Sequence, residues 1–215
     1  MTKIKICGLT RKEDIAYVNE LLPDYVGFVF AKSKRQVNLE KAKGLTDLLD
    51  RRIKTVGIFV NGDVKKVRSA AEYLKLDILQ FHGSEDEHYI KKFGDFSIWK
   101  SLSIEAQRKN LLPEDQNSYQ QKLNTIGKYD IDGILLDSSA ISAAGGTGVS
   151  FDWSIVKKIK ACKPLILAGG LKAENIQKAI EIAEPYVVDV SSGVEEHGVK
   201  NFYKINEFIK RAREF

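Results

Sequence analysis

The sequence has few of the residues that form disulfide bonds or bind structural metal ions. Its 215 residues include only two cysteines, Cys7 and Cys162, together with three histidines, four prolines and one methionine. Two cysteines cannot form a disulfide framework or, on their own, a zinc site. No apolar run approaches the ~20 residues that cross a bilayer, and the opening MTKIKICGLT lacks the apolar stretch of a signal peptide. We therefore expect a soluble, reduced, cytoplasmic protein without a membrane partner.

The charge balance does not single out a nucleic-acid partner. The 34 basic and 29 acidic residues leave a formal net charge of +5. The basic clusters at 32–35, 51–54 and 157–160 are short, and acidic residues rather than aromatics separate them. We interpret them as solvated helix faces and loop ends, and expect no nucleic acid to bind. A hydrophobic fraction of 43% instead indicates one globular domain over residues 1–215.

Short apolar runs alternate with amphipathic stretches along the whole chain. Eight runs are rich in Ile, Val and Phe, as buried parallel strands are. They span 4–7, 25–30, 55–60, 78–81, 96–99, 133–136, 164–168 and 186–190. Eight strand–helix units make either an open doubly wound sheet or a closed (β/α)8 barrel. The regular spacing, without a second-domain insertion or a nucleotide-binding glycine motif, favours the α/β class and a (β/α)8 TIM barrel.

Capping residues locate several helix starts between these runs. Thr10 and Glu13 have the spacing of a capping box, which predicts a helix over the amphipathic stretch that follows. Asp63 and Ser150 are placed to cap two later helices. The least regular stretch, 101–129, is expected to be an elongated connection with one helix.

Polar residues at the carboxyl ends of the predicted strands mark the candidate site, because barrel active sites form there. They are Cys7, Lys32 to Arg35, Asn61, His82, Lys100, Asp137, Gly169 with Gly170, and Ser191 with Ser192. Alternation along a strand puts Cys7 on the same face as Lys3 and Lys5. Asp189, inside the last strand, needs a hydrogen-bond partner or a place at the mouth of the barrel.

Glycine-rich turns concentrate in the last third of the chain, at 145–148, 168–171 and 191–194. Glycine lets backbone N–H groups approach an anion, and barrels often bind phosphate with the loops after strands seven and eight. The alternative is that these turns only reverse the chain. The predicted phosphate site consists of Gly146, Thr147, Gly169, Gly170, Ser191 and Ser192.

Cys7 and Asp137 are a candidate acid–base pair, because a thiolate can remove a proton and a carboxylic acid can donate one. The alternative for Cys7 is a small buried apolar residue. The three histidines lack the spacing of a metal-ligand set, so no metal site is expected. His82 is placed to line the site, whereas His88 and His197 are expected at the surface.

Short motifs along the chain carry a family resemblance. They are KICGLT at 5–10, GFVF at 27–30 with SKR at 33–35, VGIFVN at 56–61, QFHG at 80–83, LLDS at 135–138, GTG at 146–148 with FDW at 151–153, LAGGL at 167–171 and VDVSSGVE at 188–195. In this order, they resemble the phosphoribosylanthranilate isomerase family, (β/α)8 barrels of tryptophan biosynthesis. Phe81, where that family usually has leucine, and Asn201, where an acidic residue is commoner, depart from the pattern. The stretch 101–129 carries no resemblance.

The resemblance implies an isomerase acting on a small phosphorylated substrate. N-(5′-phosphoribosyl)anthranilate, an aminoaldose, would become 1-(2-carboxyphenylamino)-1-deoxyribulose 5-phosphate by an Amadori rearrangement. By this resemblance, Asp137 is the general acid and Cys7 is the general base. Arg35 binds the anthranilate carboxylate, His82 and Asp189 contact or orient the sugar, and the glycine turns hold the phosphate. No cofactor or metal is implied.

These roles set a condition on the two reacting groups. Asp137 must hold a proton and Cys7 must lose one near neutral pH, the reverse of their ordinary preferences. We therefore expect the site to keep Asp137 protonated and to lower the pKa of the Cys7 thiol. Lys5, on the same face as Cys7, either favours the thiolate or pairs with a carboxylate inside the barrel.

Several alternatives stay open at this point. An indole-glycerol-phosphate synthase would need a catalytic lysine–glutamate pair and an N-terminal extension, and a ribulose-phosphate epimerase would need paired aspartates and histidines with a metal. A non-catalytic phosphate-binding barrel would tolerate the loss of Cys7 or Asp137, and a nucleic-acid-binding protein would show steeply salt-dependent binding. The sequence does not distinguish a monomer from a homodimer, nor does it decide on activity towards the related histidine-pathway aminoaldose.

Overall fold

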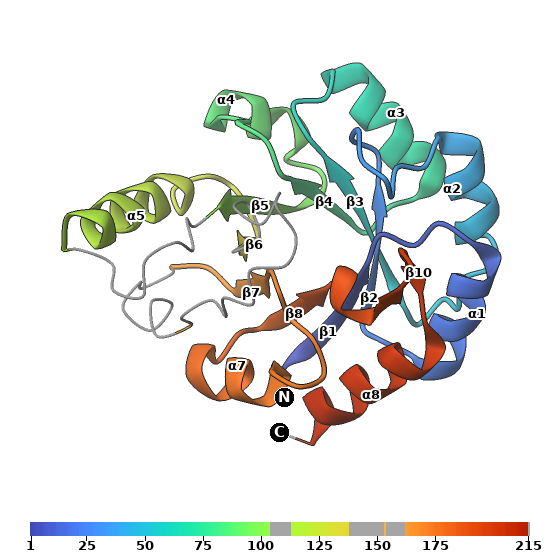
Figure 1. Ribbon diagram of the computed structural model, residues 1–215. Helices are drawn as coiled ribbons and strands as arrows, with labels where there is room; N and C mark the ends of the chain where they lie inside the picture. The colour runs from blue at the N-terminus through green and yellow to red at the C-terminus, as the bar shows by residue number, and fades with distance from the viewer. Residues whose placement is uncertain (104–112, 138–152, 154–161, 215) are drawn as a thin grey trace.

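Eight parallel strands close into a barrel in the computed structural model, which describes residues 1–103, 113–137, 153 and 162–214 (Figure 1). The strands pair in chain order, and β8 pairs with β1 to complete the ring. They are β1 (Lys3–Cys7), β2 (Tyr25–Val29), β3 (Lys54–Phe59), β4 (Ile78–Phe81), β5 (Ser97–Ser103), β6 (Gly133–Asp137), β7 (Leu165–Ala168) and β8 (Val187–Val190). The predicted (β/α)8 barrel is therefore confirmed.

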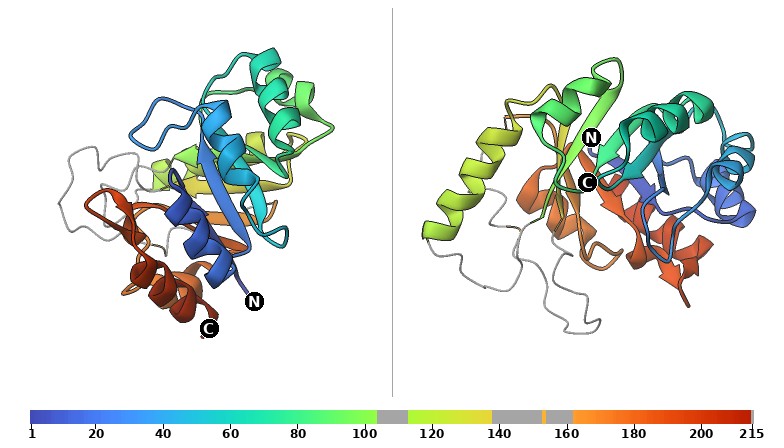
Figure 2. Two further views of the ribbon diagram at one scale, coloured as in Figure 1. Left: turned by 90° about the vertical axis from the view of Figure 1, so that its right-hand side faces the viewer. Right: turned by 90° about the horizontal axis from the view of Figure 1, so that it is seen from above.

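Helices surround the barrel on the outside (Figure 2). They are α1 (Lys12–Leu21), α2 (Leu39–Thr46), α3 (Val64–Leu74), α4 (Glu87–Ile90), α5 (Pro113–Ile126), α7 (Ile176–Ala183) and α8 (Phe202–Arg213). Shorter elements are the 3-10 turns η1 (Lys91–Phe93) and η3 (Ser192–Val194) and the hairpin of β9 (Glu195–Glu196) and β10 (Val199–Lys200). The helix predicted after Ser150 lies outside the described residues except for Trp153, which is buried.

Alternation along the strands sorts the apolar side chains into two cores. One core fills the barrel with inward-facing side chains from successive strands, including Trp99, Leu135 and Ile166. The larger core lies between the outward faces of the strands and the helices, where Phe28 and Phe208 are fully buried. Because both faces of each strand are covered, the strands read as nearly continuous apolar runs in the sequence.

The start of α1 differs from the expected capping box. Arg11, not Thr10, is the N-cap residue, and Asp14 rather than Glu13 closes the box. The Asp14 carboxylate accepts hydrogen bonds from the backbone N–H groups of Thr10 at 2.9 Å and Arg11 at 3.0 Å. Asp14 is buried and Glu13 is exposed, so the acid that closes the capping box is the one that faces the interior of the protein. The cap of α3 by Asp63 is confirmed.

Three aspartates join neighbouring strands at the amino-terminal end of the barrel. Asp24, Asp77 and Asp132 each immediately precede an even-numbered strand. Their carboxylates accept hydrogen bonds from backbone N–H groups at the start of the preceding strand, those of Ile4 at 2.9 Å, Thr55 at 2.7 Å and Ile98 at 2.9 Å. These three contacts were not predicted from the sequence, although an aspartate directly before the apolar runs at 25, 78 and 133 was the available signal.

Candidate active site

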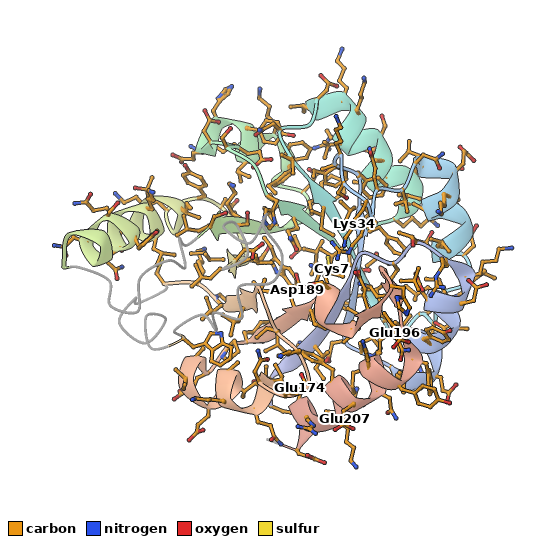
Figure 3. All side chains as sticks on the ribbon, viewed as in Figure 1. Cys7, Lys34, Glu174, Asp189, Glu196 and Glu207 are labelled. Carbon is orange, nitrogen blue, oxygen red and sulfur yellow. The ribbon has the colours of Figure 1, made fainter. Side chains whose placement is uncertain are left out.

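The carboxyl ends of the strands bring several of the expected site residues to one mouth. Cys7 ends β1 and Asp137 ends β6, and both are partly exposed. His82 directly follows β4, and Asp189 lies in β8 next to β1. Figure 3 shows Cys7 and Asp189 close together near the axis of the barrel. Cys7, His82 and Asp137 therefore lie at strand ends as expected, and Asp189 lies inside the last strand, as was also expected.

A polar layer lies directly beneath this mouth. Lys5 is fully buried inside the barrel, and its ammonium donates to Asp189 Oδ2 at 2.8 Å and to Gln80 Oε1 at 2.7 Å. Burial opposes its charge, but the charges and hydrogen bonds of Asp189 and Cys7 outweigh burial and raise the pKa of Lys5. Lys5 therefore pairs with a carboxylate inside the barrel, and its charge also favours the Cys7 thiolate, so the two alternatives for Lys5 hold together.

The Cys7 thiol lies among cations, yet its pKa is not lowered. Burial raises the pKa of Cys7, and the charge of Lys5 opposes this most strongly. The charge of Asp189 also raises the pKa of Cys7, whereas the charges of Lys200 and Arg35 lower it, as that of Lys5 does. The net result is a pKa above the ordinary value of 9.0, so the expectation of a lowered pKa is wrong. The reason is that loss of water at the end of β1 outweighs the nearby positive charges.

The imidazole of His82 spans the gap between the ends of β4 and β6. Its Nε2 lies 3.2 Å from Asp137 Oδ2, and its Nδ1 lies 3.3 Å from Gln80 Nε2. Since β5 separates β4 from β6 in the sheet, His82 is the side chain that joins these two strand ends. The partnership of His82 with Asp137 and Gln80 was not anticipated from the sequence.

Arg35 reaches the mouth from the loop after β2 and is held there by a carboxylate. Its Nε and Nη2 donate to the two oxygens of Glu195 at 2.6 and 2.8 Å. Lys200 Nζ donates to Glu195 at 2.8 Å from the other side. Gly8 has φ +81°, and a Cβ there would lie 2.4 Å from Arg35 Cδ, so glycine makes room for Arg35 to cross the end of β1. Sequence reasoning did not identify Glu195, the last residue of the 188–195 motif.

Two of the three predicted phosphate-binding turns lie side by side. Gly169 and Gly170 have φ values of 90° and 64°, which favour glycine. A Cβ on Gly193 would lie 1.9 Å from the Leu171 carbonyl oxygen, so the turn after β8 packs directly on the turn after β7. Ser192 begins η3 at this junction.

The turn after β8 is also tied to the end of β1. Ser191 Oγ donates to the backbone carbonyl of Cys7 at 3.0 Å, and Lys200 Nζ donates to the Ser191 carbonyl at 3.0 Å. Gly146 and Thr147, the third part of the predicted phosphate site, lie outside the described residues.

Lys100 does not lie at a strand end as expected, because β5 continues to Ser103. It is on the opposite face of β5 from the inward-facing Trp99. Its ammonium donates to the Gly83 carbonyl at 2.7 Å and pairs with Glu85 at 3.1 Å. Burial lowers the pKa of Lys100 despite the opposing charge of Glu85. Lys100 therefore braces the loop that follows His82.

The remaining features of the described residues do not compete with the mouth. His88 and His197 are exposed, as expected. Within the described ranges, no three His, Cys, Asp or Glu side chains are grouped to hold a metal, and no helix is long and apolar enough to span a membrane. Two concavities of about 520 and 830 Å³ lie among the loops that precede the strands, the end of a barrel associated with stability rather than catalysis.

The fold and site together define a class: a (β/α)8 barrel whose mouth carries a thiol, carboxylates and an imidazole, the side chains of acid–base enzymes. The family model described as N-(5′-phosphoribosyl)anthranilate (PRA) isomerase matches residues 4–211. The chain therefore belongs to the N-(5′-phosphoribosyl)anthranilate isomerase family, and the expected isomerase of tryptophan biosynthesis is confirmed.

Individual relatives support this membership over the full length. The chain is 47% identical to the N-(5′-phosphoribosyl)anthranilate isomerase of Thermoanaerobacter pseudethanolicus, with 99% of this chain and 98% of the relative covered. A solved structure of monomers generated from the dimeric Thermotoga maritima isomerase superimposes with a TM-score of 0.79 at 33% identity, covering all of both chains. Another isomerase structure, in complex with reduced 1-(o-carboxyphenylamino)-1-deoxyribulose 5-phosphate, has a TM-score of 0.79 at 32% identity over all of both chains.

Proposed function

We propose that this isomerase uses Asp137 as its general acid and Cys7 as its general base, and that residues 1–215 form one catalytic domain. The observation that carries the proposal is their placement: each ends a strand at the barrel mouth, on the inward face, and they come from strands on different sides of the ring. A substrate seated between them would meet an acid on one side and a base on the other.

The reaction would proceed in two catalysed proton transfers, one by Asp137 and one by Cys7, followed by tautomerisation of the product. Asp137 donates a proton to the ribose ring oxygen of N-(5′-phosphoribosyl)anthranilate, and the C1–O bond breaks as the nitrogen lone pair forms a Schiff base. The Cys7 thiolate then removes the proton from C2, and the electron pair neutralises the iminium to give an enolamine. The enolamine takes a proton at C1 and loses its hydroxyl proton, which leaves the ketone. Composition does not change, so the scheme uses no cofactor.

The charges around Cys7 support its role as a base. Its pKa is raised by burial, but Lys5, Lys200 and Arg35 all oppose that rise. These cations stabilise the thiolate relative to a thiol buried among apolar side chains.

Arg35 is proposed to bind the anthranilate carboxylate, because a guanidinium pairs well with carboxylates. The bidentate contact with Glu195 uses Nε and Nη2 and orients the group, leaving Nη1 outside that pair. Asp189 and His82 are proposed to contact the sugar. Asp189 Oδ1 is buried and without a hydrogen-bond partner among the described residues, so it suits a sugar hydroxyl as donor.

The phosphate is proposed to bind at the joined turns after β7 and β8. These supply Gly169, Gly170, Ser191 and Ser192 at one place. Gly146 and Thr147 are included in the proposal on the sequence motif alone. The partner is thus a small phosphorylated molecule and not a nucleic acid. We further propose a cytoplasmic protein that is either a monomer or a homodimer.

The test is the decay of anthranilate fluorescence after addition of fresh N-(5′-phosphoribosyl)anthranilate. Wild-type protein is expected to give rapid decay, and Cys7→Ser and Asp137→Asn are each expected to be slower by about a hundredfold or more, the scale of removing an acid or base. Cys162→Ser, which changes the exposed second cysteine, serves as the matched control and should keep wild-type activity. Full activity in Cys7→Ser or Asp137→Asn would remove that residue from the mechanism.

A further inference from the structure

A continuous line of hydrogen bonds crosses the barrel beneath the mouth. It runs from Asp189 through Lys5, Gln80 and His82 to Asp137. The successive distances are 2.8 Å from Asp189 Oδ2 to Lys5 Nζ, 2.7 Å from Lys5 Nζ to Gln80 Oε1, 3.3 Å from Gln80 Nε2 to His82 Nδ1 and 3.2 Å from His82 Nε2 to Asp137 Oδ2. Gln80 is its central member and is only 2% exposed.

The direction of each hydrogen bond follows from the ammonium at one end of this line. A lysine ammonium has three donors and no acceptor, so the group that Lys5 contacts on Gln80 must be the carbonyl oxygen. This settles the orientation of the Gln80 amide, which geometry alone often leaves ambiguous. The NH2 group of Gln80 then faces His82 Nδ1, and because NH2 only donates, Nδ1 must accept.

A neutral imidazole with an accepting Nδ1 carries its proton on Nε2. In this protein that proton points at Asp137 Oδ2. The opposite tautomer would set an Nδ1–H against the NH2 of Gln80, which brings two donors face to face whatever the state of Asp137. It would also leave Nε2 and Asp137 Oδ2 as two facing acceptors whenever that oxygen carries no proton.

We propose that Gln80 is a positioning residue that holds His82 in its Nε2–H tautomer and thereby orients Asp137 for proton transfer. The step that concerns Asp137 rests on its proposed role as the general acid. A proton on Oδ2 would face the Nε2–H donor, so the proton that Asp137 delivers belongs on Oδ1. After delivery, the hydrogen bond from His82 stabilises the carboxylate that remains.

The tautomer can be read directly in a long-range 1H–15N correlation spectrum of protein labelled at histidine. The chain has three histidines, and the His82 signals are identified by their loss in His82→Asn. In the wild type, His82 Nδ1 is expected to have the shift of an unprotonated nitrogen and Nε2 that of a protonated one. A wild-type spectrum with Nδ1 protonated would overturn the proposal.

Gln80→Glu is the decisive variant, because glutamate has nearly the same shape but presents an acceptor where Gln80 presents NH2. It still accepts from Lys5, so we expect the carboxylate to draw a proton onto Nδ1 of His82. Gln80→Met removes both hydrogen bonds and is expected to leave a mixture of tautomers. Gln177→Glu on α7, where the side chain is exposed, is the control and should leave the His82 signals unchanged. An unchanged tautomer in both Gln80 variants would refute the proposal, and Gln80→Met keeps the test valid if Gln80→Glu does not fold.

Kinetics separate positioning from a purely structural role. Folded Gln80→Glu is expected to lose about tenfold or more in kcat with a smaller change in KM, the scale on which orienting partners act. If Asp137→Asn remains active while the tautomer behaves as expected, the acid assignment fails and the role of Gln80 in fixing His82 stands. If the His82 tautomer does not respond to the Gln80 variants while Asp137→Asn is inactive, the proposed role of Gln80 fails and the assignment of Asp137 as the acid stands.

Discussion

Lys5 places a permanent positive charge inside the barrel, one layer below the Cys7 sulfur. Its 0% exposure makes its partners decisive, since an ammonium without Asp189 and Gln80 would be costly to bury. The same charge lowers the pKa of Cys7 against the effect of burial. One side chain thus links the stability of the barrel to the reactivity of the thiol.

Replacing this lysine should change both properties. Lys5→Met leaves Asp189 buried without its cation, so we expect a loss of about 3 to 5 kcal/mol in the free energy of unfolding by urea. Without the Lys5 charge the pKa of Cys7 rises further, so alkylation of Cys7 by iodoacetamide should need a higher pH than in the wild type. Both proteins carry Cys162→Ser so that only Cys7 reacts.

Lys3→Met is the matched control, because Lys3 lies on the same face of β1 but its ammonium meets the exposed Tyr186 hydroxyl at the other end of the barrel. It should leave the alkylation profile unchanged. An unchanged profile in Lys5→Met would show that the lysine charge does not reach the sulfur.

Among the connecting elements, the β9–β10 hairpin is joined to the loop after β2 by the ion pair of Glu195 with Arg35. Burial alone would raise the pKa of Glu195, but hydrogen bonds from Arg35 and Lys200, together with their charges, lower it below its ordinary value of 4.5. A carboxyl group with a lowered pKa in the folded protein binds fewer protons there than in the unfolded chain. Its contribution to stability is therefore complete above the unfolded pKa and is lost as pH falls through the folded pKa.

Glu195→Gln should accordingly remove part of the acid sensitivity of the protein. At pH 7 we expect the variant to lose about 1.5 to 3 kcal/mol in urea unfolding, the range for hydrogen bonds to charged groups. The difference from wild type should shrink as the pH is lowered towards 3, because the wild-type carboxyl becomes neutral too. Glu196→Gln, a change at the exposed neighbour in the same hairpin, should show neither effect. A difference that stays constant with pH would contradict the linkage.

At the scale of elements, the sequence located the strands well and the polar partners poorly. All eight apolar runs correspond to barrel strands, because strands covered on both faces leave a strong apolar signal. The run ending at Trp99 was too short, since β5 continues through Lys100 and Ser101, which are polar but buried. The contact of Lys5 with Gln80 joins residues 75 positions apart, so it exists only once the barrel has closed and leaves no local pattern.

The molecule as a whole separates stability from chemistry along the barrel axis. Apolar side chains such as Ile166 and Val187 fill the interior, and the strand-joining aspartates lie at the amino-terminal end. The side chains proposed to carry out the chemistry, Cys7, His82 and Asp137, lie at the carboxyl end, a position that the order of elements alone predicts for a barrel. The direction of the Cys7 pKa shift was not predictable in this way, because it depends on how deeply the end of β1 is buried.

This separation predicts that substitutions of apolar side chains in the interior weaken the fold without changing the mechanism. Ile166→Ala, at a fully buried position in β7, should cost about 2 to 5 kcal/mol in thermal or urea unfolding. At temperatures where the variant remains folded, kcat should stay within about twofold of wild type. Tyr203→Ala on α8, at a side chain that is 78% exposed, is the control and should change stability by less than about 0.5 kcal/mol. A large loss of kcat in folded Ile166→Ala would show that the interior is coupled to the chemistry.

Pairing of β1 with β8 closes the barrel, so during synthesis the barrel stays open until β8 has been made. Lys5 in β1 cannot contact Asp189 before then, because Asp189 lies 184 positions later in the chain. At about 5 to 20 residues per second, the ribosome separates the two by roughly 10 to 40 s. Throughout that interval one edge of β1 has no partner strand, and such edges recruit other chains. The five-residue length of β1 and its two lysines blunt this hazard, so the residues that charge the finished barrel also protect the nascent one.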